Sequence, residues 1–264
     1  MTDHAKGEIL DRLADLVWED GCLLVNGLVF RIDDHSRHDR VDHFDLYKSR
    51  PLLEQFATFM RRADPRQGGN VVELGIWDGG SAALWFEVLQ PDKLVAVDIS
   101  TRGDSDYLSR YRRSRGLDDR LRTYWGTDQG DRHRLRQIVS DEFDGPLDIV
   151  IDDASHLYGP TKASFETLFP LLRQGGVYII EDWQWEHGDT FQDSGHAWAN
   201  EASLTKLVFE LVEATGTQKM GTISALTVFG GFVAIERGWM TLSDPDRFVL
   251  EDRICRRPGR DGTT

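Results

Sequence analysis

The chain has 264 residues, of which 40% are hydrophobic, and this is enough for one large domain with a sizeable core. Its formal net charge of −14 excludes a general binder of nucleic acids or of anionic membranes, because such proteins carry a basic footprint. Cys22 and Cys255 lie far apart and lack CxxC spacing, which indicates a reducing compartment and no structural zinc site.

The N-terminal segment predicts a helix followed by a hairpin. MTDHAKGEIL lacks the apolar centre of a signal peptide, and no apolar run reaches the roughly 18 residues of a membrane span, so we expect a cytoplasmic protein. Apolar residues at helical spacing over 7–21 predict a helix that ends near Gly21. Asn-Gly between two apolar runs in CLLVNGLVFRI predicts a β-hairpin. Residues 1–65 do not follow the later alternation, and we expect a cap or an oligomerisation element.

From residue 70 onward, strand and helix patterns alternate. Strands are predicted at 70–75, 93–99, 121–126, 147–152 and 176–182, and helices at 80–90, 104–116, 131–141, 160–173 and 201–214. This alternation predicts an α/β domain over residues 66–238, with a parallel sheet covered by helices on both faces. ISALTVFGGFVAIERG then predicts two strands around Gly230-Gly231, which add an antiparallel edge. We expect 239–264 to be a polar tail with a disordered end.

The stretch ELGIWDGGS follows the first of these strands and opens a helix. Its glycines let the backbone turn and approach a ligand, and the helix start offers free N–H groups, so we assign Gly75, Gly79 and Ser81 to a cofactor. The spacing differs from the dinucleotide fingerprint GxGxxG, which disfavours an NAD-dependent enzyme. Glu73, at the end of the strand, suits a cationic group such as the ammonium of a methionine moiety.

Further polar residues follow the second and third strands. Asp98 ends the second, where a carboxylate can accept hydrogen bonds from both ribose hydroxyls. Asp128 and Gln129 follow the third, where they can contact an adenine amino group. Each residue alone can also be an ordinary polar loop residue. Together they favour a nucleoside cofactor at the point where the strand order reverses.

Glu73, the glycine loop, Asp98 and the terminal hairpin together resemble the class I S-adenosylmethionine-dependent methyltransferases over about residues 65–237. The resemblance implies a Rossmann-like, doubly wound, seven-stranded sheet whose final strand is antiparallel. It also implies S-adenosylmethionine as the cofactor.

Four carboxylates follow the fourth and fifth strands: Asp152 and Asp153 in IDDASH, and Glu181 and Asp182 in IIEDW. Parallel neighbours end level, so these groups converge, and like charges so close need a proton or a cation among them. Hard divalent ions such as magnesium, manganese or calcium fit such oxygen ligands. Because side chains alternate along a strand, we expect only one aspartate of IDDASH to be a ligand.

His156 follows this cluster directly. It can be a capping or ion-paired histidine, a metal ligand, or a base that takes the proton of a hydroxyl. An alcohol is a poor nucleophile at neutral pH, so a Lewis acid with a histidine base is what O-methylation needs. The first strand adjoins the fourth, which brings the expected metal beside the methyl group of the cofactor.

The long stretch IDDASHLYGPTKASFETLFPLLRQGGVYIIEDWQ is similar to the metal-dependent sugar O-methyltransferases that tailor macrolide antibiotics. It also resembles their relatives that act on rhamnose and on mycobacterial glycolipids or polysaccharides. The resemblance implies that Asp153, Glu181 and Asp182 bind Mg²⁺ or Mn²⁺ and that His156 is the base. Asp152 is assigned to the cofactor side, where it supports or caps its neighbours. The macrolide enzymes carry a large extra N-terminal domain, so the acceptor surface does not transfer.

Two segments are candidates for acceptor binding. Residues 183–200 are rich in tryptophan, histidine and acids, and their aromatic rings either stack on a sugar or pack on one another. His187 and His196 in this segment are alternative bases. The segment DHFDLYKSRPL offers groups that either hold a carboxylate or, as we favour, are ordinary surface residues: His43, Tyr47, Lys48 and Arg50.

The resemblance therefore implies an S-adenosylmethionine- and Mg²⁺-dependent O-methyltransferase that acts on a sugar or glycoside hydroxyl, and we expect a homo-oligomer. One alternative is an enzyme like the cephalosporin-methoxylation proteins, with a β-lactam acceptor. A second is a cofactor-binding scaffold without activity, although a scaffold has no need of a repulsive acid cluster.

Overall fold

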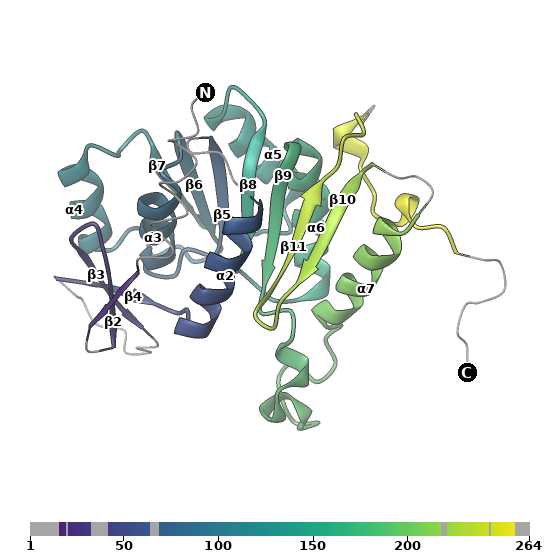
Figure 1. Ribbon diagram of the computed structural model, residues 1–264, viewed down its shortest axis with the longest axis horizontal. Helices are drawn as coiled ribbons and strands as arrows, with labels where there is room; N and C mark the ends of the chain where they lie inside the picture. The colour runs from purple at the N-terminus through teal and green to yellow at the C-terminus, as the bar shows by residue number, and fades with distance from the viewer. Residues whose placement is uncertain are drawn as a thin grey trace.

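The computed structural model describes residues 16–19, 21–32, 42–63, 69–217, 221–242 and 244–256. A seven-stranded sheet in the order β10-β11-β9-β8-β5-β6-β7 runs through the molecule, with helices on both of its faces (Figure 1). A second sheet of four strands, β1-β2-β3-β4, lies beside it. Among the described residues, no helix combines the length and the apolar character that a bilayer crossing requires.

The predicted alternation of strands and helices is confirmed. The parallel strands are β5 (Asn70–Leu74), β6 (Lys93–Asp98), β7 (Leu121–Trp125), β8 (Leu147–Asp152) and β9 (Leu172–Glu181). The helices are α3 (Gly80–Leu89), α4 (Asp106–Arg115), α5 (Arg132–Glu142), α6 (Tyr158–Leu168) and α7 (Leu204–Thr215).

One predicted boundary between a helix and a strand is wrong. We expected a helix to residue 173, but α6 ends at Leu168 and a short 3-10 turn, η1 (Phe169–Leu171), leads into β9. Pro170 lies in this turn, and proline cannot continue the backbone hydrogen bonding of an α-helix.

The terminal hairpin consists of β10 (Ile223–Val228) and β11 (Phe232–Arg237). The predicted antiparallel strand is confirmed as β11, which pairs antiparallel to β9. The predicted antiparallel edge is also confirmed, because β10 is the outermost strand of the sheet and β11 lies between β9 and β10. The side chains from Phe232 to Ile235 are all fully buried, as befits a strand with neighbours on both sides.

The second sheet consists of β1 (Val17–Glu19), β2 (Cys22–Val25), β3 (Leu28–Ile32) and β4 (Phe44–Leu46). The predicted Asn-Gly hairpin is confirmed, with φ of 49° at Asn26 and 79° at Gly27. The helix predicted over 7–21 is wrong in its described part, because Val17–Glu19 pairs with the open edge of β2. The rest of that prediction lies outside the described residues.

The helix α2 (Arg50–Ala63) was not predicted. It buries Leu53, Phe56 and Met60, and the ring of Phe56 stacks on that of Phe232 at a centroid distance of 4.3 Å. This contact fixes α2 against the antiparallel strand β11 of the main sheet. The helix thereby covers part of one face of that sheet.

Side chains of the main sheet alternate between two core layers. Val71, Ile149 and Ile179 face the layer that contains α2, α3 and the second sheet, whereas Val72 and Val150 face the layer of α5, α6 and α7. The second layer also buries Phe248 and Leu250 from the segment around η4 (Pro245–Arg247) and η5 (Glu251–Arg253). The expected polar tail is thus packed into the core as far as it is described, and its final residues lie outside the described part.

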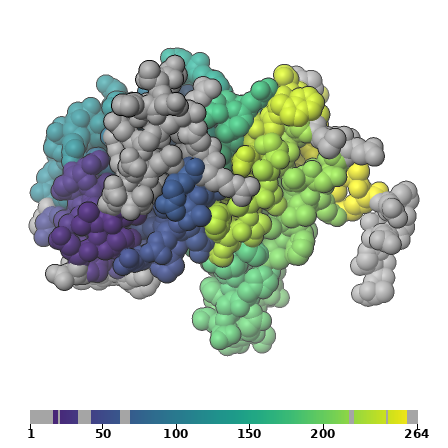
Figure 2. Space-filling view, viewed as in Figure 1, coloured from purple at the N-terminus to yellow at the C-terminus, as the bar shows by residue number. Residues whose placement is uncertain are grey.

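Residues 183–200 protrude from the body of the molecule, where they form the green lobe of Figures 1 and 2. This lobe contains two short 3-10 turns, η2 (Trp185–His187) and η3 (Asp189–Gln192). It begins directly after β9, so its base adjoins the carboxyl end of the sheet.

Candidate active site

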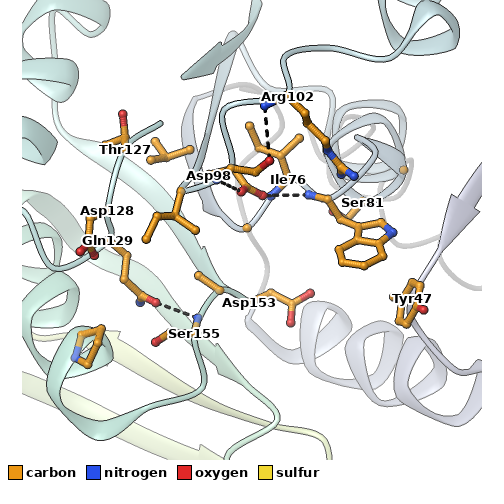
Figure 3. Close-up of a pocket in the computed structure, with 18 of the residues that line it drawn as sticks. Tyr47, Ile76, Ser81, Asp98, Arg102, Thr127, Asp128, Gln129, Asp153 and Ser155 are labelled. Atoms are coloured by element: carbon orange, nitrogen blue, oxygen red, sulfur yellow. Dashed lines mark hydrogen bonds between the residues drawn. The ribbon is translucent and has the colours of Figure 1, made fainter. Parts of the chain in front are cut away.

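A cavity of about 710 Å³ opens at the carboxyl ends of β5, β6 and β8. This volume lies within the range of about 300 to 1,000 Å³ that is typical of small-molecule sites. Asp98, Asp128 and Asp153 contribute to the lining from the ends of three different strands (Figure 3). The N-terminal segment contributes Asp45, Tyr47 and Lys48.

The glycine loop packs so tightly that two of its glycines have no room for a side chain. A Cβ atom at Gly75, where φ is 99°, would lie 2.2 Å from the carbonyl oxygen of Asp153. A Cβ atom at Gly80 would lie 2.1 Å from the carbonyl oxygen of Asp45. Gly79 has a φ of 88° and begins α3, and Ser81 lines the cavity. The loop therefore brings β5, the chain after β8 and the N-terminal segment together at the cavity wall.

Asp98 fastens this loop to the end of β6. Its Oδ2 atom accepts hydrogen bonds from the backbone N–H groups of Ile76 (2.8 Å) and Trp77 (3.0 Å), and its Oδ1 atom accepts one from Ser100 (2.7 Å). These bonds orient the carboxylate at the cavity wall (Figure 3). A carboxylate has about four lone-pair sites, so acceptor capacity remains, and ribose binding by Asp98 stays a prediction.

Glu73 lies in β5 with no exposed surface, and it is not among the residues that line the cavity. Neither carboxylate oxygen has a hydrogen-bond partner within the described part of the chain. Burial raises the pKa of Glu73 to about 8, although the charge of Lys48 and the hydroxyl of Ser81 act in the opposite direction. The contact with a cationic ligand group stays a prediction. Such a partner would stabilise the charged form of the buried carboxylate.

Gln129 and Asp152 form a buried polar network below the cavity. The Nε2 atom of Gln129 donates to Oδ1 of Asp152 (3.0 Å), and its Oε1 atom accepts from the backbone N–H of Ser155 (2.8 Å). Asp152 also accepts from the hydroxyls of Ser164 and Tyr178, each at 2.7 Å. Burial raises the pKa of Asp152 to about 6.

This network bears on two expected cofactor contacts. The amide of Gln129 is already bonded to the protein, and Asp152 does not line the cavity. Asp152 instead holds Gln129 and the turn after β8 in place, as a supporting group. Asp128 lines the cavity, and its Oδ1 atom accepts from the backbone N–H of Gly130 (2.7 Å). Gln129 also lines the cavity, so adenine recognition by Asp128 and Gln129 stays a prediction.

The acid cluster forms where the sequence predicts it, at the adjacent ends of β8 and β9. One ligand atom each from Asp153, His156 and Asp182 lies within 4.8 Å of the others. Burial and then the charge of Asp153 raise the pKa of Asp182. His156 and Asp182 have φ angles of 56° and 51°, a strained conformation for residues other than glycine that concentrates at functional sites.

The residues present fit a divalent cation. Two of the three carry carboxylates that repel each other, and the third presents an imidazole whose buried Nδ1 atom has no hydrogen-bond partner among the described residues. The Nε2 atom of His156 lies 3.9 Å from Oδ1 of Asp153. Oxygen ligands with one nitrogen suit magnesium or manganese better than zinc.

Glu181, the remaining expected ligand, contacts a lysine instead. Lys48 is only 1% exposed, and its Nζ atom donates to Oδ2 of Asp153 and to both carboxylate oxygens of Glu181, each at 2.7 Å. Burial alone would lower the pKa of Lys48, but the charges of Asp153 and Glu181 outweigh burial and raise it. The view of Lys48 as an ordinary surface residue is wrong.

The other residues of the segment 42–50 are divided between different places. His43 lies 2.7 Å from Oδ1 of Asp42, Tyr47 lines the cavity, and the exposed Arg50 pairs with Glu54. Sequence reasoning favoured surface positions for this segment, because its local pattern does not indicate that it enters the site.

The aromatic residues of the protruding lobe pack on one another. The rings of Trp185 and Trp198 are 5.0 Å apart between centroids, and Phe191 stacks on Trp198. The indole N–H of Trp185 donates to the carbonyl oxygen of His156 (2.7 Å), so the lobe anchors that residue. His187 bonds to Thr205 and His196 accepts from the backbone N–H of Trp198, and neither belongs to the acid cluster.

Comparisons with known proteins agree with this architecture. Residues 72–183 match the family model described as a methyltransferase domain. A tetracenomycin C rhamnosyl 3'-O-methyltransferase from Streptomyces olivaceus is 36% identical over 140 residues, which cover 50% of this chain and 31% of that protein. Mycinamicin VI 2''-O-methyltransferase from Micromonospora griseorubida is 33% identical over 159 residues, or 57% of this chain and 36% of that protein.

Among solved structures, the MycE methyltransferase from the mycinamycin pathway, in complex with Mg, SAH and mycinamycin VI, superposes with a TM-score of 0.54. It is 27% identical, and the match covers 70% of this chain and 49% of that one. The chain spans about a third of the length of the curated relatives it matches.

Proposed function

Since residues 72–183 form a class I S-adenosylmethionine-dependent methyltransferase domain, we propose that this chain methylates a hydroxyl of a sugar or glycoside with the help of Mg²⁺ or Mn²⁺. The observation that carries the proposal is the acid cluster, which lies at the wall of a cofactor-sized cavity. Asp153 belongs to both.

The cofactor occupies the cavity over the glycine loop in this proposal. Gly75 and Ser81 line the wall beside its methionine part, Gly79 forms the turn into α3, and Asp98 receives the ribose hydroxyls. Glu73 is a buried carboxylate of β5 whose oxygens have no hydrogen-bond partner in the described structure, which favours its pairing with the ammonium group. The proposal keeps Asp128 for the adenine.

The acid cluster handles the acceptor hydroxyl. Asp153, His156 and Asp182 are placed to hold the cation, whereas the family resemblance implies Glu181 as the third ligand in place of His156. A bound divalent cation supplies a Lewis acid that lowers the pKa of a hydroxyl, and the cofactor supplies the methyl group. In the alternative role, His156 takes the hydroxyl proton as the new C–O bond forms and the S–CH₃ bond breaks. The protein then contributes mainly by orienting the two reactants.

The named relatives support a sugar acceptor. Two of them are named as O-methyltransferases of rhamnosyl tetracenomycin C, and the matched region contains every predicted ligand of the acid cluster. We also propose a homo-oligomeric enzyme of the cytoplasm, a location with which the two free cysteines, Cys22 and Cys255, agree.

The test is methyl transfer from isotopically labelled S-adenosylmethionine to a panel of rhamnosyl and other deoxysugar glycosides, with mass spectrometry of the products. We expect labelled product with Mg²⁺, loss of turnover in EDTA, and recovery when Mg²⁺ is added. Calorimetric binding of S-adenosylhomocysteine should persist in EDTA. Full activity in metal-free enzyme contradicts the metal role, and labelled product only from a β-lactam arm favours the methoxylation alternative. Cofactor binding without any product across the panel favours a scaffold.

A further inference from the structure

Lys48 is the least expected charge in the molecule. Lysine is almost never fully buried unless it is paired, and this one makes three hydrogen bonds of 2.7 Å to two carboxylates. Glu181 is as deeply buried as Lys48 and offers it both oxygens, whereas Asp153 offers only Oδ2 and is partly exposed. Glu181 is thus the principal partner of the lysine.

The fold places Lys48 close to the glycine loop. Lys48 follows β4, whose residues Phe44, Asp45 and Leu46 are all buried. The carbonyl of Asp45 packs against Gly80 so closely that no side chain fits there. Lys48 is therefore fixed from both sides, by β4 before it and by α2 after it. The long side chain of Lys48 is therefore a fixed part of the site.

The charge balance of the site indicates the role of Lys48. Asp153, Glu181 and Asp182 carry three negative charges, and the ammonium of Lys48 compensates one of them. The two remaining charges match one divalent cation. The ligand atoms that lie close enough together to share such a cation belong to Asp153, His156 and Asp182, and Glu181 is not in this set.

We propose that Lys48 is a positioning residue that withholds Glu181 from the metal. The cation is then held by Asp153, His156 and Asp182, and the lysine sets how tightly the site binds it. This inference rests on the metal dependence proposed above. It differs from the ligand set implied by the family resemblance, in which Glu181 coordinates the ion directly.

The consequence is that loss of the lysine should strengthen metal binding. In Lys48→Met, Glu181 is free to become a further carboxylate ligand, and the number of charged ligands governs the affinity of a hard-cation site. We expect the Kd for Mn²⁺, measured by electron paramagnetic resonance with the whole chain, to fall by about tenfold or more. Adding Glu181→Gln to this variant should return the Kd to within about threefold of wild type.

Lys93 supplies a matched control. It is also ion-paired, with Glu142 at 2.7 Å, but it lies outside the acid cluster. Lys93→Met should leave the Kd for Mn²⁺ unchanged. An unchanged or weaker affinity in Lys48→Met overturns the proposal, as does a gain that persists after Glu181→Gln.

A variant with an unpaired buried carboxylate can fail to fold, so single substitutions on the acid side provide a second test. Glu181→Gln in the presence of Lys48 removes a charge but no ligand, so it should weaken the binding of Mn²⁺ less than Asp182→Asn, which removes a ligand and should weaken it by about tenfold or more. Equal losses in the two variants assign Glu181 to the metal and overturn the proposal. If wild type binds no Mn²⁺, the metal role in the proposed function itself fails; if it binds Mn²⁺ normally, only the role of Lys48 is at stake.

Discussion

The burial of the Glu73 carboxylate lowers the stability of the folded chain, and a cationic ligand can offset this loss. Glu73 is buried in the centre of the parallel sheet, where strands otherwise contribute Val71, Val72 and Leu74 to the core. The charge of Lys48 and the hydroxyl of Ser81 only partly offset its burial, which raises its pKa to about 8. Such a group is typical of a site in which the ligand, rather than the fold, completes the interactions.

The raised pKa of Glu73 predicts a pH dependence of stability. Between its ordinary value near 4.5 and its folded value near 8, the folded chain binds a proton that the unfolded chain releases. Its contribution is therefore complete below about pH 4.5 and is lost as the pH rises toward 8. Glu73→Gln removes this dependence, so the variant should gain stability relative to wild type between pH 5 and 8, by an amount on the order of a few kcal/mol.

Urea unfolding of both proteins without cofactor, at several pH values across this window, measures that difference. Parallel stability curves for wild type and Glu73→Gln would show that burial does not shift the carboxyl group in this way.

At the scale of elements, a side-chain hydrogen bond from Trp185 connects the protruding lobe to His156 of the site. Trp185 packs against Phe191 and Trp198, and its indole N–H reaches the carbonyl oxygen of His156. His156 has a left-handed backbone conformation, which costs on the order of 1 to 3 kcal/mol and needs support from its surroundings. The lobe thus has a structural role in the site even before any acceptor is considered.

Trp185→Phe keeps an aromatic ring but removes this bond, so we expect kcat to fall about three- to tenfold, as the loss of about 1 kcal/mol predicts. The Kd for S-adenosylhomocysteine should not change. Trp198→Phe is the control, because Trp198 lies in the same aromatic cluster and does not bond His156. His156→Ala should lower kcat by about 100-fold or more, which is the largest loss expected in this series. Equal effects in the two tryptophan variants would mean that the lobe acts through its packing alone.

At the scale of the whole molecule, the N-terminal sheet and the main sheet share one core. Phe44 of β4 stacks on Phe30 and makes edge contacts with Tyr107 and Tyr111 of α4. The hydroxyl of Tyr111 and the side-chain amide of Asn26 both donate to the buried Glu87 of α3. The segment expected to be a cap or an oligomerisation element therefore shares a core with the layer that contains α3 and α4.

This integration predicts that the two sheets unfold together. Phe44→Ala should lower the free energy of unfolding by about 3 to 5 kcal/mol in a single cooperative transition, because it opens a cavity in the shared core. Val17→Ala, at an exposed position of the edge strand β1, should change it by less than about 0.5 kcal/mol. Denaturation followed by circular dichroism and by tryptophan fluorescence checks this. A separate early transition, in which Phe44→Ala affects only that step, would contradict a shared core.

The sequence by itself determined the elements of the main sheet and the edge at which the site lies. Continuous apolar runs, helical spacing and clustered glycines are local properties, so they identified β5 to β9 and the loop at Gly75 without any knowledge of distant contacts. The convergence of Asp153 and Asp182 also followed, because neighbouring parallel strands end at the same edge.

Only the tertiary structure decided which charges meet. Lys48 reaches Glu181 across 133 positions of sequence, by way of a second sheet whose docking depends on side-chain packing between surfaces that no local pattern pairs. The same holds for Asp152. The alternation of side chains along a strand predicts that Asp152 points away from Asp153, but only the fold connects it to Gln129, Ser164 and Tyr178. Local patterns specify where a polar group leaves a strand, whereas burial and the choice of partner depend on the whole packed molecule.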